Sequence, residues 1–528
     1  MAEVETFDII IVGAGTAGCV LASRLSEDES CRVLLLEAGG QARDPLIAAP
    51  GAAKMFWDTA LDWAFRSEPQ QHLNGRRILL NRGKCIGGSG TINWCAYVRG
   101  NRGDYDAWAQ LGCTGWGYDD VLPYFRKSER NAMHDDEWHG TDGPLHVGEF
   151  HGRHPLHELY FEALEDLGVP RNPDFNGVQQ EGCGYHQGTL LDGARFSTAD
   201  GFLAPALERP NLTVRSWAHV TGLVIENGRA TGVDYVVGRE ARRARAETEV
   251  VLAAGAIGSP HILLLSGIGP ADEIAAHGVT PLHDLPGVGR SLRDHIARPS
   301  IEIMVKDPEA IGLGTATPDF RTARAMFEAD RKGPLATIQI EAGAFVRLRE
   351  TDAHPSAQLF CGVSNAERFR EMTPGLSLWG YVCRPRSEGT VKLATASPFD
   401  RPSIDPNYFD DRDDVDRNVE IVEFCREVAN HRAFRAVRAG LQGAFKTRAE
   451  FLAAARDVSS TCWHYTSTCR MGTDELAVVD PDLRVIGIEG LRVCDASIMP
   501  TMVSGNTNAA TIMIAEKGSD LICASASG

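Results

Sequence analysis

The fold is indicated by one segment near the N-terminus, Phe7-Asp8-Ile9-Ile10-Ile11-Val12-Gly13-Ala14-Gly15-Thr16-Ala17-Gly18. Its first half is a β-branched apolar run of the kind that forms a buried parallel strand, and residues 19–25 continue as a helix of small residues. The three glycines have separate roles. The first permits a tight turn, the second admits a pyrophosphate to backbone N–H groups, and the third lets helix and strand pack closely. The segment therefore predicts a dinucleotide-binding strand–turn–helix unit.

A carboxylate follows at the spacing that such a unit requires. Residues 32–36 form a second apolar strand that ends at Glu37, 19 residues beyond Gly18. A carboxylate at this position binds a ribose 2′-hydroxyl and disfavours the 2′-phosphate of NADP. The pattern by itself leaves NAD and FAD open.

A second glycine-rich segment favours FAD. Residues 82–93 read Arg-Gly-Lys-Cys-Ile-Gly-Gly-Ser-Gly-Thr-Ile-Asn, which offers small residues and backbone donors to a large flat cofactor. Two glycine-rich segments that approach the cofactor suit an extended FAD better than a nicotinamide cofactor. The alternative for residues 82–93 is a plain surface loop. Residues 101–116 mix charged and aromatic side chains, which suits either a polar loop over the cofactor or an amphipathic surface segment.

Length and composition set the class of protein. A chain of 528 residues predicts two or three domains, and 43% hydrophobic with 23% charged residues is typical of a soluble globular protein. The formal net charge of −18 argues against nucleic acid or an anionic membrane surface as partner. The acidic N-terminus lacks the features of a secretory signal, and no segment approaches the ~20 apolar residues of a membrane span, so we expect a cytoplasmic protein. The 13 cysteines include no C-x-x-C pair, which predicts buried thiols rather than disulfides or zinc.

The chain is expected to leave the nucleotide-binding domain and return to it. A hairpin signal around Asn227-Gly228 and a buried strand over 249–252 lie in a second piece of that domain. Residues 300–455 contain alternating strands that suit an antiparallel sheet beside a cavity. We expect an α/β fold: a discontinuous Rossmann-type FAD-binding domain over 1–155, 205–300 and 456–528, and an α+β substrate-binding domain over 156–204 and 301–455.

Two polar residues near the C-terminus, His464 and Asn506, are the candidate catalytic pair. An imidazole can take a proton from a hydroxyl, while a carboxamide hydrogen-bonds the oxygen that loses it. That is the chemistry of alcohol oxidation. A lone histidine is more often a structural hydrogen-bonding residue, so this assignment depends on what the fold builds around the pair.

Several motifs together give the chain a family resemblance. These motifs are Gly13–Gly18 with Glu37-Ala38-Gly39, Gly87–Gly90 with Asn93, Gly255–Pro260 with Ser266–Gly269, and the His464 and Asn506 segments. Through them the chain resembles the glucose-methanol-choline (GMC) family of FAD-dependent oxidoreductases almost from end to end. Within the family, it is most similar to bacterial L-sorbose dehydrogenase and its alcohol dehydrogenase relatives, through Trp138–Gly140, Asn172–Gly177, Tyr381–Pro385 and Asn506–Ile514.

The resemblance implies a set of FAD-binding residues: Gly13, Gly15, Thr16, Ala17, Gly18, Glu37, Ala38, Gly87, Gly88, Ser89, Asn93, Val220, Trp463, Asp495, Ala496 and Thr507. Val220 would meet the adenine through its backbone, and a plain sheet residue is the alternative reading. Some relatives bind the flavin covalently through a histidine at the position of Ile92, so the FAD here is expected to be non-covalent. No metal site is expected, and Asp294-His295 is expected to be a structural contact.

These residues predict FAD-dependent oxidation of a primary alcohol, such as a sugar, polyol or other small alcohol, to the aldehyde. His464 would be the base and flavin N5 the hydride acceptor, with Asn506 stabilising the substrate oxygen. A redox-silent lyase of the same fold, like the hydroxynitrile lyases, is the alternative, and a flavin-binding protein without catalysis is a third hypothesis. The electron acceptor (oxygen, quinone or dye), the particular alcohol, the specificity residues and the oligomeric state stay open.

Overall fold

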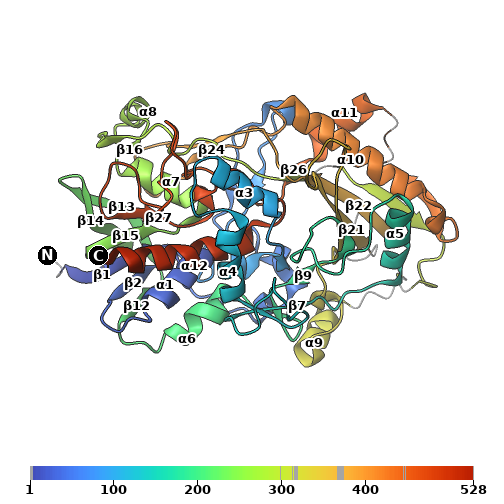
Figure 1. Ribbon diagram of the computed structural model, residues 1–528, viewed down its shortest axis with the longest axis horizontal. Coiled ribbons are helices and arrows are strands. Elements are labelled where there is room, and N and C mark those ends of the chain that lie inside the picture. Colours follow the sequence, from blue (N-terminus) through green and yellow to red (C-terminus); the bar gives the residue numbers. More distant parts are fainter. Residues whose placement is uncertain are drawn as a thin grey trace.

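The computed structural model describes residues 4–297, 299–311, 313, 319–364, 374–443, 445 and 447–526. Figure 1 shows two halves, each built around its own β-sheet, with helices and connecting segments around them. The start of β1 (Glu5–Val12) and the end of α12 (Thr507–Ala526) lie at the same end of the molecule. The fold is the expected α/β class, with a parallel nucleotide-binding sheet and a separate antiparallel sheet.

The first sheet has seven strands in the order β12-β2-β1-β15-β14-β13, with β27 beside β15. Their bounds are Leu212–Arg215 for β12, Val33–Leu36 for β2, Glu240–Leu252 for β15, Arg229–Val237 for β14, Ala218–Glu226 for β13 and Leu491–Val493 for β27. β12, β2, β1, β15 and β27 run parallel, while β13 and β14 form the antiparallel hairpin expected around Asn227. Asn227 and Gly228 both have positive φ, as a two-residue hairpin turn requires.

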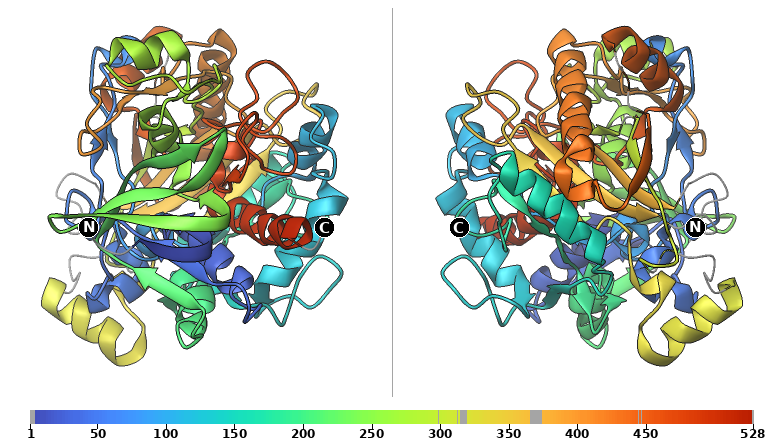
Figure 2. Two further views of the ribbon diagram at one scale, coloured as in Figure 1. Left: turned by 90° about the vertical axis from the view of Figure 1, so that its left-hand side faces the viewer. Right: turned by 90° about the vertical axis from the view of Figure 1, so that its right-hand side faces the viewer.

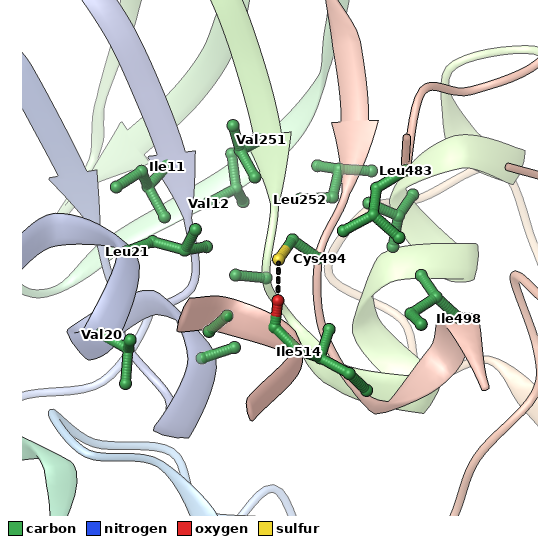
Figure 3. Close-up of a cluster of buried hydrophobic side chains, with 14 of the residues drawn as sticks. Ile11, Val12, Val20, Leu21, Val251, Leu252, Leu483, Cys494, Ile498 and Ile514 are labelled. Atoms are coloured by element: carbon green, nitrogen blue, oxygen red, sulfur yellow. Dashed lines mark hydrogen bonds between the residues drawn. The ribbon is translucent and has the colours of Figure 1, made fainter. Parts of the chain in front are cut away.

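The core of this half lies between the parallel strands and two helices. α1 (Thr16–Leu25) and α12 lie side by side under the sheet, so the first and last helices of the chain share one core (Figure 1). In Figure 3, side chains from β1, β15 and α1 meet those of the C-terminal segment. There the Cys494 thiol donates to the carbonyl of Ile514 at 3.5 Å. This packing places the C-terminal segment beside β1 and α1, the strand and helix that flank the first glycine-rich turn.

The second sheet has six antiparallel strands in the order β25-β19-β22-β21-β20-β8. Their bounds are Arg438–Gln442, Ile301–Val305, Gly375–Val382, Ala357–Ser364, Ala342–Val346 and Gly182–Tyr185, respectively. α10 (Arg412–Asn430) and α5 (Pro155–Asp166) cross its outer face, as the right-hand view of Figure 2 shows. Leu376 and Leu378 of β22 belong to the core on that face, while Trp379 and Tyr381 pack in a separate aromatic cluster. The period-two alternation of a strand therefore turns the two rings away from the helices.

The remaining elements connect and cover the two sheets. The longer helices among them are α3 (Arg102–Gln110), α4 (Tyr118–Ser128), α7 (Gly255–Leu265), α8 (Ala271–Ala276), α9 (Phe320–Asp330) and α11 (Arg448–Val458). A four-stranded sheet has the order β5-β9-β7-β6, with bounds Ala96–Tyr97, Gln187–Gly188, Leu145–Glu149 and Glu129–Asn131. The polar loop considered for residues 101–116 is wrong, because most of the segment is the amphipathic helix α3, with Tyr105 and Trp108 buried inside. Of the helices described, none is long and apolar enough to cross a membrane.

Candidate active site

A cavity of about 560 Å³ runs between the glycine-rich turns of the first sheet and the inner face of the second. Its volume is in the range of cofactor and drug-sized ligand sites. All the predicted site residues lie on its wall except Gly18 and Gly87: Gly13, Gly15, Thr16, Ala17, Glu37, Ala38, Gly88, Ser89, Asn93, Val220, Trp463, His464, Asp495, Ala496, Asn506 and Thr507. Segments separated by hundreds of residues thus meet around one space.

Gly18 and Gly88 show why the cavity needs glycines. A Cβ on Gly18 would lie 1.8 Å from the carbonyl oxygen of Gly13, so glycine lets α1 pack against the end of β1. Gly88 has a φ of +54°, and its Cβ would lie 2.6 Å from the Cα of Gly15. The two glycine-rich segments are therefore in backbone contact, and together they form a cradle that fits an extended dinucleotide.

Glu37 lies at the carboxyl end of β2, where the ribose-binding carboxylate is expected. One carboxylate oxygen accepts from the backbone N–H of Ala14 at 2.9 Å, and the other accepts from that of Gly39 at 2.8 Å. Burial raises the pKa of Glu37 to about 7, against the lowering effect of these two hydrogen bonds. Each oxygen keeps a further lone pair, so the side chain can both hold the glycine-rich turn and accept from a ribose hydroxyl.

Hydrogen bonds hold the C-terminal segment at the cavity at two points. Asp495 accepts from the backbone N–H of Gly255 at 2.8 Å and from the hydroxyl of Ser259 at 2.5 Å, which ties β27 to the start of α7. The hydroxyl of Thr16 donates to the side-chain oxygen of Asn508 at 2.9 Å, which ties α1 to the start of α12. These contacts hold Asn506, just before α12, at the cavity.

His464 and Asn506 are in direct contact. The Nε2 atom of His464 lies 3.0 Å from the amide nitrogen of Asn506, and both side chains line the cavity. The backbone N–H of His464 donates to Asp294 at 2.8 Å, which fixes the main chain beneath the ring. The preceding residue, Trp463, has a φ of +62°, a strained conformation of the kind that clusters at functional sites. The expected pair therefore meets across a hydrogen bond.

A chain of hydrogen bonds determines the tautomer of His464. His295 Nε2 lies 2.8 Å from the carbonyl oxygen of Cys383, which can only accept, so this nitrogen carries the proton. The Nδ1 atom of the neutral His295 is then an acceptor, and it lies 2.9 Å from His464 Nδ1. His464 therefore carries its proton on Nδ1 and leaves Nε2 free to accept from Asn506. The arrangement presents an unprotonated Nε2 to the cavity.

The electrostatic surroundings keep both imidazoles neutral. Burial lowers the pKa of His295 to about 3. Burial also lowers the pKa of His464 well below its usual value, and the neighbouring His295 ring and the Arg82 guanidinium add to the effect. The Arg82 guanidinium donates to the carbonyl of Trp463, directly beside the ring. A neutral His464 is consequently available as a proton acceptor at neutral pH.

One polar atom of the pair has no partner. The side-chain oxygen of Asn506 is buried, and no group in the described part of the chain hydrogen-bonds it. The amide nitrogen also has a second hydrogen beyond the one directed at His464. Buried polar atoms are normally satisfied, so an unsatisfied carboxamide at a cavity indicates that a ligand completes it.

Comparison with known proteins identifies the family. Two models described as GMC oxidoreductase match residues 7–297 and 385–515. The chain belongs to the GMC oxidoreductase family. It is 39% identical to the alcohol dehydrogenase [acceptor] of Pseudomonas putida over 98% of this chain and 95% of that protein. It is also 39% identical to the mitochondrial choline dehydrogenase of Homo sapiens, over 98% of this chain and 90% of that protein.

Pyridoxine 4-oxidase from Mesorbium loti has the same fold with a TM-score of 0.89 and 32% identity, over 97% of this chain and 98% of that chain. The cofactor of this GMC protein is FAD.

Sequence reasoning missed several residues of the GMC site. Asp294-His295 was expected to be a structural contact, but that expectation did not connect it with the base, and both residues hydrogen-bond His464. Arg82 was read as part of a glycine-rich segment and given no role, and the aromatic residues Phe360, Trp379 and Tyr381 of the cavity wall were not singled out. The alternation Ser377, Trp379, Tyr381 in β22 is the signal that could have found two of them. Among the residues described, no three His, Cys, Asp or Glu side chains are placed to hold a metal ion.

Proposed function

We propose that this protein is an FAD-dependent alcohol oxidoreductase in which His464 is the base and Asn506 binds the substrate oxygen. The observation that carries the proposal is the 3.0 Å contact between His464 Nε2 and the Asn506 amide, at a cavity that begins at the glycine-rich cradle. The relatives that are alcohol and choline dehydrogenases support oxidation of an alcohol, and they do not favour the lyase alternative.

In the proposed mechanism the alcohol hydroxyl inserts between the two side chains. It donates its proton to His464 Nε2 and accepts a hydrogen bond from the Asn506 amide, replacing the contact that the pair makes with each other. FAD, when bound, supplies the acceptor for the carbon-bound hydrogen. His464 gains a positive charge as it takes the proton, while its Nδ1–H keeps donating to His295. Asn506 stabilises the negative charge that develops on the oxygen, and the burial of the pair strengthens such a hydrogen bond.

We also propose that the FAD is bound without a covalent link. Ile92, at the position where some family members are expected to carry a linking histidine, is buried and has only a hydrocarbon side chain. The cradle of the two glycine-rich turns, with Glu37 and Asp495 beside it, supports tight non-covalent binding.

The proposed division into domains follows the sheets. The seven strands of the first sheet come from residues 1–155, 205–300 and 456–528, and the six strands of the second come from 156–204 and 301–455. This membership supports an FAD-binding domain and a substrate-binding domain with those boundaries. The cavity between the two sheets is then an interdomain site, a common place for a cofactor and its substrate to meet.

A test of the function is anaerobic bleaching of the bound flavin. The holoenzyme is mixed without oxygen with a panel of primary alcohols and, separately, with a cyanohydrin. The proposal predicts loss of the oxidised flavin absorbance with at least one alcohol. Cyanohydrin cleavage with no bleaching by any alcohol would contradict it. Repeating the active case with oxygen or with a dye then identifies the electron acceptor.

A further inference from the structure

The wall of the cavity beside His464 is made of aromatic rings. Phe360 of β21 and Trp379 of β22 are directly paired in the sheet, and their rings stack with centroids 4.4 Å apart and an interplanar angle of 24°. Tyr381, two residues along β22, has its centroid 5.8 Å from that of His464, edge to face. All three residues line the cavity, with Trp379 the most exposed of them and Phe360 and Tyr381 packed behind and beside it. They form an aromatic wall that ends at the proposed base.

Three tryptophans add a second aromatic group to the same cavity. The ring of Trp463, next to His464 in sequence, has its centroid 4.7 Å from Trp57 and 5.4 Å from Trp94. All three line the cavity and are partly exposed to it. Aromatic faces of this kind bind flat unsaturated molecules by stacking and edge-to-face contact.

The polar groups of the β21–β22 wall bond to one another rather than to the cavity. The Tyr381 hydroxyl donates to the side chain of Gln358, and the amide of Gln358 lies 3.2 Å from Nε2 of His186. His186 Nδ1 lies 3.2 Å from the carbonyl of Glu341, which fixes its proton on that nitrogen. A site that selects polyols needs several hydrogen-bonding groups directed at the hydroxyls, because binding specificity for such substrates comes from paired polar atoms. On this wall, the side chains of Tyr381, Gln358 and His186 already hydrogen-bond protein groups, so they are not available to substrate hydroxyls.

The Arg82 guanidinium brings a positive charge close to His464, whereas the buried Asp294 carboxyl, its pKa raised to about 6, accepts from the backbone N–H of His464 and does not line the cavity. Arg82 lines the cavity and lowers the proton affinity of His464. The carboxylates on the described part of the wall are engaged by protein groups: Glu37 by Ala14 and Gly39, Asp495 by Gly255 and Ser259, and Asp400 by Thr395. A cationic alcohol would therefore meet the like charge of Arg82 beside the reacting carbon, and each carboxylate on the described wall already accepts a hydrogen bond from a protein group.

We infer that the substrate is an uncharged primary alcohol whose CH2OH group is carried by an aromatic or similarly flat unsaturated ring. The inference rests on the proposed function, since it takes His464 as the reacting end of the cavity. The ring lies against Phe360 and Trp379 and directs its CH2OH group past Tyr381 to His464. The hydroxyl proton goes to His464 Nε2, and the carbon-bound hydrogen leaves with its electron pair to FAD, which gives the aromatic aldehyde.

A four-alcohol panel tests the inference by anaerobic flavin bleaching. The probes are 4-methoxybenzyl alcohol, cyclohexylmethanol as its saturated counterpart, sorbitol and choline. We expect the aromatic alcohol to bleach the flavin with a second-order rate constant about 10-fold above cyclohexylmethanol, the ratio that one favourable aromatic contact supplies, and further above the other two. A rate for sorbitol or choline equal to or above that of the aromatic alcohol would overturn the inference and leave the proposed function intact. Bleaching by no alcohol at all overturns both.

Matched variants test whether the preference for the aromatic alcohol depends on the rings of Phe360 and Trp379. F360L and W379L remove a ring but keep an apolar side chain, and F451L makes the same exchange at a buried phenylalanine of α11 outside the cavity. We expect F360L and W379L to lower the rate with 4-methoxybenzyl alcohol about 10-fold and to leave cyclohexylmethanol within 2-fold. F451L should keep the wild-type ratio. Binding of 4-methylanisole, which has no hydroxyl and is not oxidised, is measured in parallel through the absorbance of the bound flavin and should weaken in the first two variants only. An unchanged ratio and unchanged binding in both wall variants would contradict the inference.

Discussion

The Nδ1 atoms of His295 and His464 lie 2.9 Å apart, and the Nε2 atom of His295 lies 2.8 Å from the carbonyl of Cys383. Because that carbonyl can only accept, the two rings share one arrangement of protons, in which His464 donates from Nδ1 and offers Nε2 to the cavity. His295 thus acts through His464 as a positioning residue. Its ring also stacks on Tyr381, with centroids 4.1 Å apart, which links the base to the aromatic wall.

Replacement of His295 should slow flavin reduction without changing the chemistry. H295F removes the acceptor for His464 Nδ1–H, so we expect the reduction rate to fall about 10- to 100-fold, the usual effect of losing a group that orients a reacting residue. H295Q offers both a carbonyl and an amide N–H and can bridge Cys383 to His464, so it should recover much of the rate. Stopped-flow reduction of the two holoenzymes measures the difference. Equal losses in H295F and H295Q would show that tautomer control is not the role of His295.

The pH dependence of flavin reduction should report the low pKa of His464. Since burial and positive charge favour the neutral ring, the acidic limb of the profile is expected well below pH 6.5. R82M removes a positive charge beside the ring, so the pKa of His464 should rise and the limb should move to higher pH. R82K keeps the charge and should leave the limb near its wild-type position. A limb that stays in place in R82M would contradict the electrostatic assignment.

Because the two glycine-rich turns are in contact at Gly88, alanine at this position should destabilise the protein more than alanine at Gly75. Gly88 and Gly75 both have positive φ, but only the Cβ of Gly88 meets backbone, whereas that of Gly75 meets open space. We expect G75A to lose about 1 to 2 kcal/mol of unfolding free energy from backbone strain alone. G88A should lose roughly 1 to 3 kcal/mol more and should purify with less FAD. Thermal unfolding and the flavin-to-protein absorbance ratio measure both, and equal behaviour of the two variants would exclude the proposed contact.

The Ile92 position predicts that the flavin is released by denaturation. Acid precipitation of the holoenzyme should leave the yellow colour in the supernatant, since the hydrocarbon side chain of Ile92 cannot form a covalent bond to the flavin ring. Colour retained in the washed pellet would show a covalent link elsewhere on the cavity wall, and mass spectrometry of the digested pellet would locate it.

The nucleotide-binding half was the more predictable part of the fold. Strand, glycine turn, helix and Glu37 follow one another within a short segment, and each step is dictated by local backbone geometry. The hairpin at Asn227 was predictable for the same reason, because its turn needs two residues with positive φ. His464 and Asn506 could be proposed as a pair from the chemistry of alcohol oxidation, supported by the family resemblance, but their contact could not be predicted, since nothing local joins two segments that the fold brings together.

The residues that were missed depend on contacts between distant segments. His295 and His464 are 169 positions apart, and neither neighbourhood indicates that the rings meet. The aromatic wall was similarly hidden, because Phe360 and Trp379 become neighbours only through the register of β21 and β22. Arg82 lies in a motif whose glycines suggest backbone contacts, so its side chain received no role. Tertiary pairing of this kind is not encoded in any short window of sequence.

Rapid mixing of the H464A holoenzyme with the most reactive alcohol of the panel, in the absence of oxygen, tests the central claim. General-base catalysis contributes about 10²- to 10⁴-fold to a rate, so the first-order rate constant for flavin bleaching should fall by that factor while the FAD content and the unfolding temperature stay close to wild type. A bleaching rate within 2-fold of wild type would contradict the account, because the alcohol would then lose its proton without the imidazole of His464.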